Sequence, residues 1–333
     1  YQYIGQYYST ESAVSSFGQF GGFAISANRT REEAILWKEY DSVLGSNVAF
    51  YPGLGGLTLD NHHFYSPGAR ELYLGDGTMR TAAQNYSIME RVAGKYSGSS
   101  PFGENVPAKS VPLGAPLDMA VSPDGSIYIV TENFIRKVDT NGSISTFANF
   151  FQSTFFETIA IGPDGSIYAG RRPESSRNNN FIYKYSPDGQ YEIIAGTGTG
   201  GYSGDGGPAL NAEFGYIKGL AVANDGSIYI ADNSNYRVRK IDRNGIVTTV
   251  AGNGTFGSSG DGGPARNAQT IPFGVSVDND GNLYIVEDRF NRIRKVTPDG
   301  IITTVAGNGS IGSAGVGGPA TQANVNFPTW AVM

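Results

Sequence analysis

Cysteine is absent from the 333 residues of this chain, and only two histidines are present. Without cysteine the chain forms neither disulfides nor thiolate metal sites. The two histidines are neighbours, His62 and His63. Successive side chains of a strand point to opposite faces, so these two cannot bind one metal ion from the same side. A histidine-based zinc site and a Ser–His–Asp triad are therefore not expected, and we predict one packed and one exposed histidine.

Charged residues and long apolar runs are also scarce. Asp, Glu, Lys and Arg make up 16% of the chain, and the formal net charge is −6. Nucleic-acid binding favours a basic face, so this balance argues against a nucleic-acid partner. No apolar run approaches the roughly 18 residues that are needed to span a bilayer. We therefore expect no membrane span.

Glycine and aromatic residues are abundant instead. The chain contains 47 Gly, 20 Tyr and 18 Phe, which is typical of many short strands joined by tight turns. A cysteine-free chain of this kind fits a secreted or surface protein of bacteria, and a cytosolic protein remains the alternative. The sequence starts at Tyr1 without a signal peptide and ends at Met333 in the middle of a pattern. We therefore expect it to be a piece of a longer protein.

One stretch of sequence occurs twice. Residues 219–254 and 274–309 align at a shift of 55, and both copies end in TTVAGNG. A tyrosine that follows a glycine turn marks five such units, at steps of 55, 40, 61 and 55 residues: Tyr73, Tyr128, Tyr168, Tyr229 and Tyr284. A repeat of this size is one supersecondary unit that buries its apolar surface against its own copies. A sixth unit opens at residues 327–332.

The unit around Tyr229 predicts four antiparallel strands. Residues 220–222 are apolar, Asn-Asp-Gly then turns the chain, and residues 228–230 alternate as a second strand. Residues 236–241 predict the third strand and residues 246–250 the fourth, with an Asn-Gly turn between them. Four antiparallel strands with short turns, followed by a long link to the next unit, are typical of a propeller blade.

The repeat predicts an all-β chain with a six-bladed β-propeller over residues 46–333. Residues 1–45 carry no copy and are predicted to be a separate β-rich segment, or one that closes the ring. Within it, residues 31–41 fit either a short helix with an acidic first turn or an amphipathic strand. The sixth blade supplies only its innermost strand. Either residues 1–55 complete it, or its other strands are missing.

The long links between units repeat as well. They read YSGDGGPA, SSGDGGPA and SAGVGGPA, which place Asp205, Asp261 and Val316 at one position. A site that needs this carboxylate from every blade is excluded, and we predict that the two aspartates bond to amides of their own turns. The unit around Tyr168 lacks such a link and has a polar insertion at residues 171–180. The insertion is interpreted as a tolerated surface loop, with a contact site as the alternative.

Two further motifs carry charge. The sequence Asp278-Asn279-Asp280-Gly281 opens like a calcium loop, but the rest of the twelve-residue pattern is missing, so a hairpin turn is the better interpretation. Basic tracts at residues 237–240 and 292–295, with Arg136-Lys137, place cations at equivalent positions. Acids interleave with them: Asp232, Asp242, Glu287 and Asp288. We therefore predict solvated strands with partial charge pairing rather than an RNA-binding ring. No catalytic, cofactor-binding or metal-binding residue is predicted.

The units, of the form GxAVxxDGxIYIAD…N…RIRKV…G.ITTVAG, resemble NHL repeats over roughly residues 115–333. Residues 53–81, with FGQFGG and LWKEY upstream, resemble the large RHS/YD-repeat proteins, bacterial relatives of teneurins. One departure is Leu57, where that family has tryptophan. In that family a β-rich plug precedes an NHL propeller and a tyrosine-rich YD shell follows, and no YD repeats occur in this chain.

The resemblance implies a non-enzymatic platform for adhesion or for capping a secreted shell. Its partners would be a protein or carbohydrate ligand, or the remainder of the parent protein, and no cofactor or catalytic residue is carried over. Two rival functions remain open: a propeller lyase or hydrolase with a metal ion at the central channel, and an RNA-binding NHL propeller.

Overall fold

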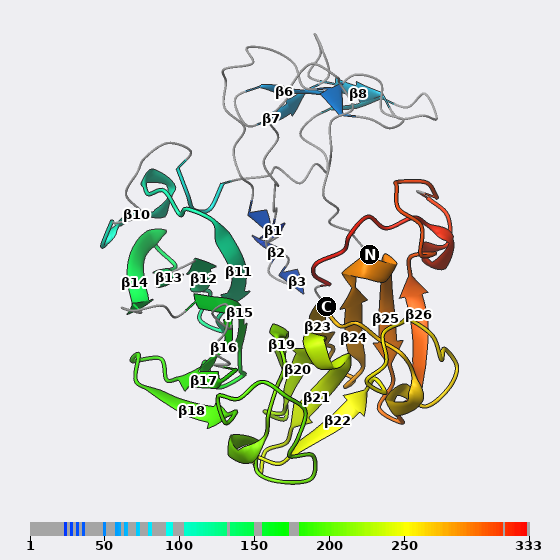
Figure 1. Cartoon of the computed structure of the whole chain (residues 1–333). Helices are drawn as coiled ribbons and strands as arrows, with labels where there is room; N and C mark the ends of the chain where they lie inside the picture. The colour runs from blue at the N-terminus through cyan, green and yellow to red at the C-terminus, as the bar shows by residue number, and fades with distance from the viewer. Residues whose placement is uncertain are drawn as a thin grey trace, which may run out of the picture.

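The computed structural model consists of antiparallel β-sheets that follow one another along the chain (Figure 1). It describes residues 91–95, 103–131, 134–149, 155–172, 180–315 and 317–331, together with the backbone of short strands between residues 23 and 81. The predicted all-β class is confirmed.

Four of the sheets contain a four-stranded antiparallel meander, and we name them blades A to D. Their strands are β11 (Pro116–Val121), β12 (Ile127–Thr131), β13 (Phe134–Val138) and β14 (Ser143–Asn149) in A; β15 (Phe155–Ile161), β16 (Ile167–Arg172), β17 (Ile182–Tyr185) and β18 (Tyr191–Ala195) in B; β19 (Ile217–Val222), β20 (Ile228–Asp232), β21 (Arg237–Ile241) and β22 (Val247–Ala251) in C; and β23 (Gly274–Val277), β24 (Leu283–Glu287), β25 (Arg292–Val296) and β26 (Ile302–Ala306) in D. Strand order in space follows strand order in the chain, as predicted for the repeat unit.

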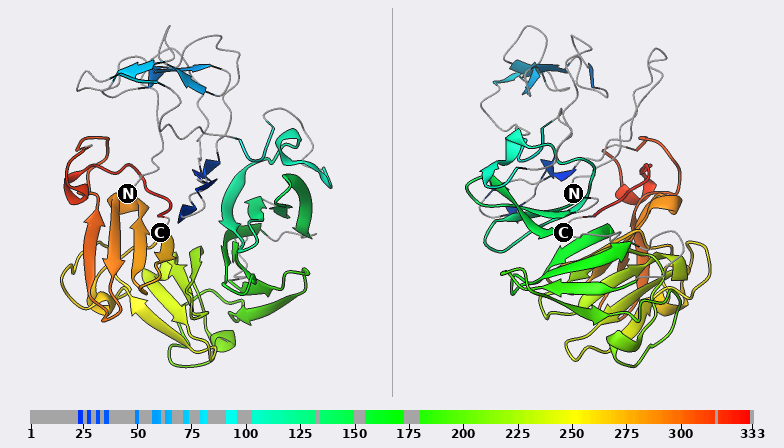
Figure 2. Two further views of the ribbon diagram at one scale, coloured as in Figure 1. Left: turned by 180° about the vertical axis from the view of Figure 1, so that it is seen from behind. Right: turned by 60° about the vertical axis from the view of Figure 1, so that its left-hand side comes forward.

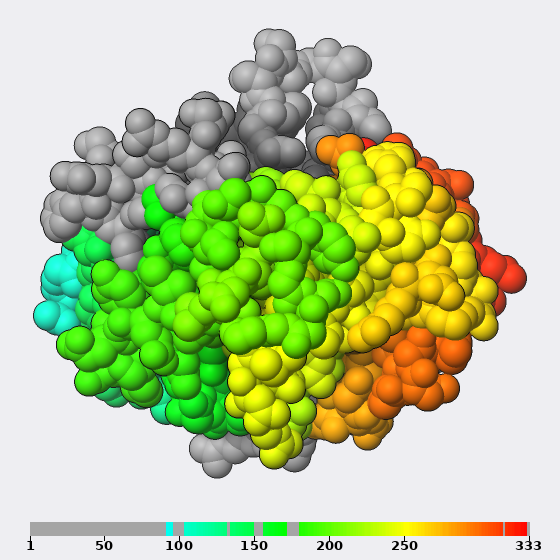
Figure 3. All heavy atoms as spheres, turned by 60° about the horizontal axis from the view of Figure 1, so that its bottom comes forward, coloured from blue at the N-terminus to red at the C-terminus, as the bar shows by residue number. Residues whose placement is uncertain are grey.

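The blades are arranged around a common axis. Their first strands, β11, β15, β19 and β23, lie innermost and each contacts the next one. Figures 1 and 2 show the sheets in order from cyan through green and yellow to orange, and Figure 3 shows them as one continuous surface. This is the predicted propeller arrangement. The number six remains a prediction, because four complete blades lie in the described part of the chain.

The hydrophobic core lies between blades rather than within them. One cluster joins Tyr168 and Ile182 of blade B to Ile217 and Leu220 of blade C. Equivalent clusters join blade A to blade B and blade C to blade D. A single four-stranded sheet therefore has no core of its own, which is the physical reason for the repeat.

Glycine turns with an acidic cap connect the first two strands of each blade. In blades A, B and C an aspartate accepts the N–H of a serine two residues later, in the pairs Asp124–Ser126, Asp164–Ser166 and Asp225–Ser227. In blade D, Asp278 Oδ1 accepts from the N–H groups of Asp280 (3.0 Å) and Asn282 (2.8 Å). The Asp-Asn-Asp-Gly motif is therefore a hairpin turn, as predicted.

Short strands precede blade A. The strand β1 (Phe23–Ala24) pairs with β4 (Ile35–Leu36), and β2 (Ala27–Asn28) pairs with β3 (Arg31–Glu32); β5 (Ala49–Phe50), β6 (Leu57–Asp60) and β7 (His63–Tyr65) form a sheet, and β8 (Glu71–Tyr73) pairs with β9 (Met79–Thr81). Of the two alternatives for residues 31–41, the backbone takes the extended one at residues 31–32 and 35–36. The predicted boundary after residue 45, the residue His62 and the His63 side chain lie outside the described residues.

The predicted innermost strand of a sixth blade is not formed at residues 327–331. These residues nevertheless lie beside blade D, because a Cβ atom on Gly274 would approach the carbonyl oxygen of Thr329 to 2.7 Å. A second strand with which they could pair is not among the described residues. The segment therefore takes the inner position without forming a ladder.

The described helices are single 3₁₀ turns: η2 (Ala108–Ser110), η3 (Ala209–Asn211), η4 (Asn233–Asn235), η5 (Ala265–Asn267), η6 (Asp288–Phe290) and η7 (Ala320–Gln322). In the part of the chain that the structure describes, none is long and apolar enough to cross a membrane. The turns η3, η5 and η7 follow the GGPA sequences of the links and contact the last strands of blades B, C and D.

Substitution of Gly252 by alanine tests how closely the link packs on a blade. Gly252 has a φ of +89°, and a Cβ atom there would lie 2.2 Å from the carbonyl oxygen of Tyr236. We expect Gly252→Ala to lower the free energy of unfolding in urea by roughly 2 to 3 kcal/mol, because strain and a backbone clash add. The matched control is Gly226→Ala, where φ is +81° and nothing lies within 4 Å. It should cost about 1 kcal/mol, and equal losses would contradict the close packing.

Candidate functional site

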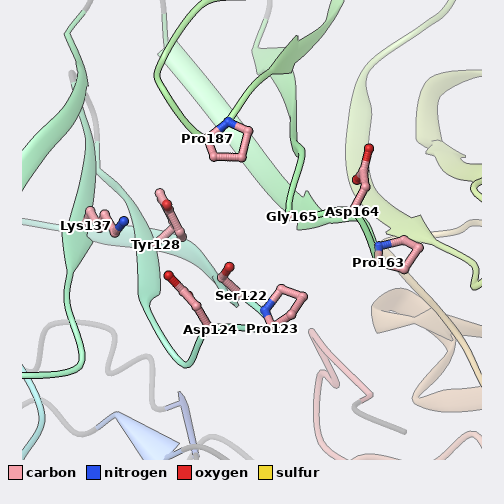
Figure 4. Close-up of a pocket in the computed structure, with 9 residues that line it drawn as sticks. All are labelled: Ser122, Pro123, Asp124, Tyr128, Lys137, Pro163, Asp164, Gly165 and Pro187. Carbon is pink, nitrogen blue, oxygen red and sulfur yellow. The ribbon is translucent and has the colours of Figure 1, made fainter.

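A pocket of about 300 Å³ lies between blades A and B (Figure 4). It is lined by hairpin-turn and strand residues of both blades: Ser122, Pro123, Asp124, Tyr128, Lys137, Pro163, Asp164, Gly165 and Pro187. Lys137 lies across from Tyr128 on the neighbouring strand, and its Nζ is 5.4 Å from the ring centroid. The hydrogen bond from the Ser126 N–H holds the pKa of Asp124 below its usual value. That carboxylate is therefore an ionised turn cap rather than a proton donor.

The same constellation recurs in every described blade. A second pocket of about 360 Å³ between blades C and D contains Tyr229 and Lys240. The lysine Nζ lies 5.4 to 5.8 Å from the tyrosine ring in each blade, in the pairs Tyr128–Lys137, Tyr168–Lys184, Tyr229–Lys240 and Tyr284–Lys295. The tyrosines that mark the repeat thus take part in cross-strand cation–π contacts. Because the tyrosine–lysine pair recurs in each described blade, the pocket between blades A and B follows from the repeat and does not mark a distinctive site.

The innermost strands of blades B and C bring an ion pair to the centre of the array. Lys218 Nζ lies 2.5 Å from Glu157 Oε1 and 4.3 Å from the Tyr216 ring centroid. Burial opposes the charge of Lys218, but the hydrogen bond and charge of Glu157 outweigh it and raise the pKa of the lysine. A paired cation at this position disfavours a metal ion. Among the described residues, no group of three or more His, Cys, Asp or Glu side chains could hold one.

The prediction of solvated third strands is wrong at one arginine of each basic tract, whereas Arg237, Lys240, Arg292 and Lys295 are partly exposed. Arg136, Arg239 and Arg294 are at most 2% exposed. Each projects from the third strand of its blade under a preceding link, which covers the guanidinium. Arg239 Nε donates to Asp205 Oδ1 at 2.9 Å, and its Nη2 donates to the carbonyl of Ser203 at 2.9 Å.

Asp205 of the link bonds to blade C instead of to amides of its own turn, so that prediction is wrong too. It accepts from the N–H of Thr249 at 3.1 Å, from the Tyr202 hydroxyl at 3.0 Å and from Arg239. Partial burial opposes its ionisation, but the Thr249 hydrogen bond and the Arg239 charge outweigh this and lower its pKa. We call this set of link carboxylate, third-strand arginine and fourth-strand threonine the clamp.

Blades A and D have the same clamp. In blade D, Asp261 accepts from Arg294 Nε and from the N–H of Thr304, both at 3.0 Å. In blade A a glutamate replaces the aspartate, as the pairs Glu104–Thr146 (2.7 Å) and Glu104–Arg136 (3.6 Å) show. The clamp joins each of these blades to the link that precedes it.

A second, fully buried carboxylate balances the arginine in blades C and D. Asp232 Oδ2 lies 3.6 Å from Arg239, and Glu287 Oε1 lies 3.5 Å from Arg294. Burial raises the pKa of Asp232 to about 6, although Asn235 and Gly215 donate hydrogen bonds to it. The predicted partial charge pairing is confirmed at these two acids. The other two interleaved acids, Asp242 and Asp288, accept N–H groups of residues that follow them closely in the chain.

Blade B lacks the clamp. Tyr183 occupies the arginine position, because it pairs with Ala169 as Arg239 pairs with Ile230. Ile193 occupies the threonine position opposite it. The outer strand β18 is the last strand of its sheet, and Tyr191 and Ile193 are 62% and 39% exposed. The outer edge of blade B is therefore open and apolar.

The sequence signal for this edge was the short step of 40 residues before Tyr168, which leaves no room for a link. Sequence reasoning assigned that irregularity to the insertion at residues 171–180 instead. Residues 173–179 of the insertion lie outside the described residues. At its end, Asn180 is buried and its Nδ2 donates to the carbonyl of Phe214 at 2.7 Å.

Residues 87–259 match the model of the teneurin NHL domain. Teneurin-m of Drosophila melanogaster is 29% identical over 298 residues, which cover 82% of this chain and 11% of that protein. Teneurin-1 of Homo sapiens is 29% identical over 240 residues, covering 67% of this chain and 9% of that protein. The chain thus spans about a tenth of the length of these relatives.

Solved structures with a similar fold include a virginiamycin B lyase from Staphylococcus aureus, at 18% identity and a TM-score of 0.40, with 74% of this chain and 68% of that chain covered. A putative gluconolactonase has 11% identity and a TM-score of 0.42, with 73% and 69% covered. The sequence match covers blades A, B and C, whose strands the structure describes. This chain therefore belongs to the teneurin NHL domain family.

Proposed function

We propose that this chain is a non-enzymatic recognition module of a larger secreted or cell-surface protein of the teneurin and RHS type. In this proposal the propeller is a rigid platform that contacts another protein. A protein ligand is favoured over a carbohydrate, and the parent protein would carry a YD-repeat shell after the propeller.

The proposal of a non-enzymatic role rests on the observation that the repeated charged side chains bond to one another. The arginines and carboxylates that the repeat places at equivalent positions, such as Arg239, Asp205 and Asp232, bond to one another inside the blades. The turn aspartates Asp124 and Asp225 accept the N–H groups of Ser126 and Ser227 in their own turns. The outer strand of blade B exposes two large hydrophobic side chains side by side, Tyr191 and Ile193. A strand edge with exposed apolar side chains suits protein recognition.

The rival function, a lyase or hydrolase with a central metal ion, would need donors at the inner strands. The ion pair Lys218–Glu157 lies there instead.

A bead assay with metal analysis tests the proposed function. Beads coated with the full 333-residue chain should adhere to cells of the source strain. Mild trypsin treatment of the cells should abolish adhesion, and periodate oxidation of their glycans should leave it intact. Elemental analysis of chain dialysed against Ca²⁺, Zn²⁺ and Mn²⁺ should find less than one ion per chain. Loss of adhesion after periodate would indicate a carbohydrate ligand, and a stoichiometric ion with hydrolytic or lyase activity would overturn the proposal.

A further inference from the structure

The edge of blade B is best understood from the blades in which the same edge is covered. In blade C the link runs along β22: Gly206 N–H donates to the carbonyl of Val247 at 2.7 Å, and Val247 N–H donates to that of Gly207 at 3.0 Å. In blade D, Ile302 makes the same two bonds with Gly262 and Gly263. The GDGG segment is a turn, closed by a hydrogen bond from the Gly207 N–H to the carbonyl of Gly204 in blade C and from the Gly263 N–H to that of Gly260 in blade D. This turn bonds through its main chain to the outer edge of each of these two blades.

The main chain of Tyr191 is the equivalent of the main chain of Val247. Tyr191 pairs with Tyr185 as Val247 pairs with Ile241, and Ile193 is the equivalent of Thr249. The outward-facing main chain of these two residues makes no hydrogen bond with any other described residue. A strand edge with unpaired N–H and C=O groups is a template for one more strand.

The side chains next to the outer edge of β18 do not suit a segment that carries an aspartate, as the link of blade C does. In blade C the link carboxylate meets Arg239 and Thr249, but in blade B the same place holds Tyr183 and Ile193. Tyr191 adds a third apolar surface, because its ring centroid lies 5.9 Å from that of Tyr183. A carboxylate placed there could still accept the N–H of Ile193, but it would lose the cation that Arg239 supplies in blade C and would lie against Tyr183 and the Ile193 side chain instead.

We propose that the outer edge of β18 binds a glycine-turn segment of a partner protein, and that this segment carries an apolar side chain at the position of the link aspartate. Its main chain pairs with Tyr191 as the Gly-Gly sequence pairs with Val247 in blade C, and its apolar side chain packs on Tyr183 and Ile193. This inference rests on the proposed protein-binding role and assigns that role to one edge.

The third link of this chain supplies a matched pair of probes. The peptide SAGVGGPA, which has the sequence of residues 313–320, carries valine at the clamp position, and SAGDGGPA carries aspartate. Titrated into the ¹⁵N-labelled full chain and followed by NMR, the valine peptide should bind blade B roughly tenfold more tightly than the aspartate peptide, a difference that about 1.4 kcal/mol produces. No binding of the valine peptide, or equal binding of both, overturns the proposal.

Two kinds of variant separate recognition from folding. The double substitution Tyr183→Arg and Ile193→Thr copies the clamp of blade C and should reverse the preference, so that the aspartate peptide binds more tightly. Tyr191→Pro removes the edge N–H and should abolish binding, whereas Tyr191→Val, the residue of blade C, should retain it. Near-ultraviolet circular dichroism confirms that each variant is folded.

The remaining outcomes are also decisive. Binding that persists in folded Tyr191→Pro overturns strand pairing at this edge. A concentration-dependent dimer that Tyr191→Pro abolishes would assign the edge to a second copy of the chain and overturn the peptide proposal. If Tyr191→Pro beads still adhere to cells, the docking edge is wrong while the recognition function stands.

Discussion

Replacing Arg239 with methionine is expected to lower the free energy of unfolding by about 3 to 5 kcal/mol, the cost of breaking a buried ion pair from one side. The guanidinium is fully buried and serves Asp205, Asp232 and the carbonyl of Ser203. Methionine fills a similar volume but leaves the fully buried Asp232 carboxylate without the cation of Arg239. Urea unfolding at pH 7, followed by tyrosine fluorescence, measures the loss.

The neighbouring position is the control for this substitution. Lys240→Met removes a cation from the same strand, but this lysine is only partly buried and lies 5.4 Å from the Tyr229 ring centroid. It should cost less than about 1 kcal/mol. Adding Asp232→Asn to Arg239→Met should recover part of the loss, because the uncompensated carboxylate is removed. Equal losses for Arg239→Met and Lys240→Met would show that the clamp adds nothing to stability.

The blades themselves could be predicted because their signals are local. An Asp-Gly turn lies between two apolar strands, and the positive φ at Gly226 and the Asp225 cap are set within four residues. The recurrence of Tyr128, Tyr168 and Tyr229 then gives the blade period. Such signals need no knowledge of what packs on the sheet, so the four-strand unit was correctly predicted.

The clamp could not be predicted because its partners are distant in the chain. Asp205 and Arg239 are 34 positions apart. In the tract RVRK, charged and apolar residues alternate as they do in a strand with one solvated face. Arg239 is buried only because the preceding link covers it. In blade A the carboxylate is Glu104, which lies in a link without the GDGGPA sequence. A search for that motif would therefore have missed it.

The open edge of blade B was visible in the sequence only as an irregularity. The missing link, and Tyr183 in place of arginine, are both present in the printed sequence. Their meaning depends on the register that places Tyr183 opposite Ile193 and leaves Tyr191 at the outside. Register is a property of the folded sheet, and a shift by one residue would reverse both faces.

The second large effect is the influence of the Asp118 side chain on how stability depends on pH. Asp118 lies on β11 of blade A and bonds to blade B. Its side chain is completely buried, and its Oδ2 accepts the N–H of Ile159 at 2.8 Å, while its Oδ1 accepts its own neighbour's N–H, that of Met119, at 2.7 Å. Burial raises the pKa of Asp118 to about 7, although these hydrogen bonds act in the opposite direction. The folded chain therefore binds this proton more tightly than the unfolded chain, in which aspartate titrates near pH 4.

Asp118 should make the chain less stable as the pH rises from about 4 to about 7. Its contribution is fully present below the unfolded pKa and is lost as the pH passes through the folded pKa, with a total change on the order of 4 kcal/mol. The variant Asp118→Asn cannot ionise, so its stability should not show this loss. Asparagine keeps one acceptor for two N–H groups, which costs about 1 kcal/mol at every pH.

The stability curves of the original chain and of Asp118→Asn should therefore cross. At pH 4 the variant should be the less stable protein by about 1 kcal/mol, and at pH 8 it should be the more stable one by roughly 2 to 3 kcal/mol. Urea midpoints at half-unit steps of pH measure the difference, in which the other titrating groups cancel. A constant offset between Asp118→Asn and the original chain would mean that the Asp118 carboxylate does not titrate between pH 4 and pH 8, and that its two hydrogen bonds dominate over its burial.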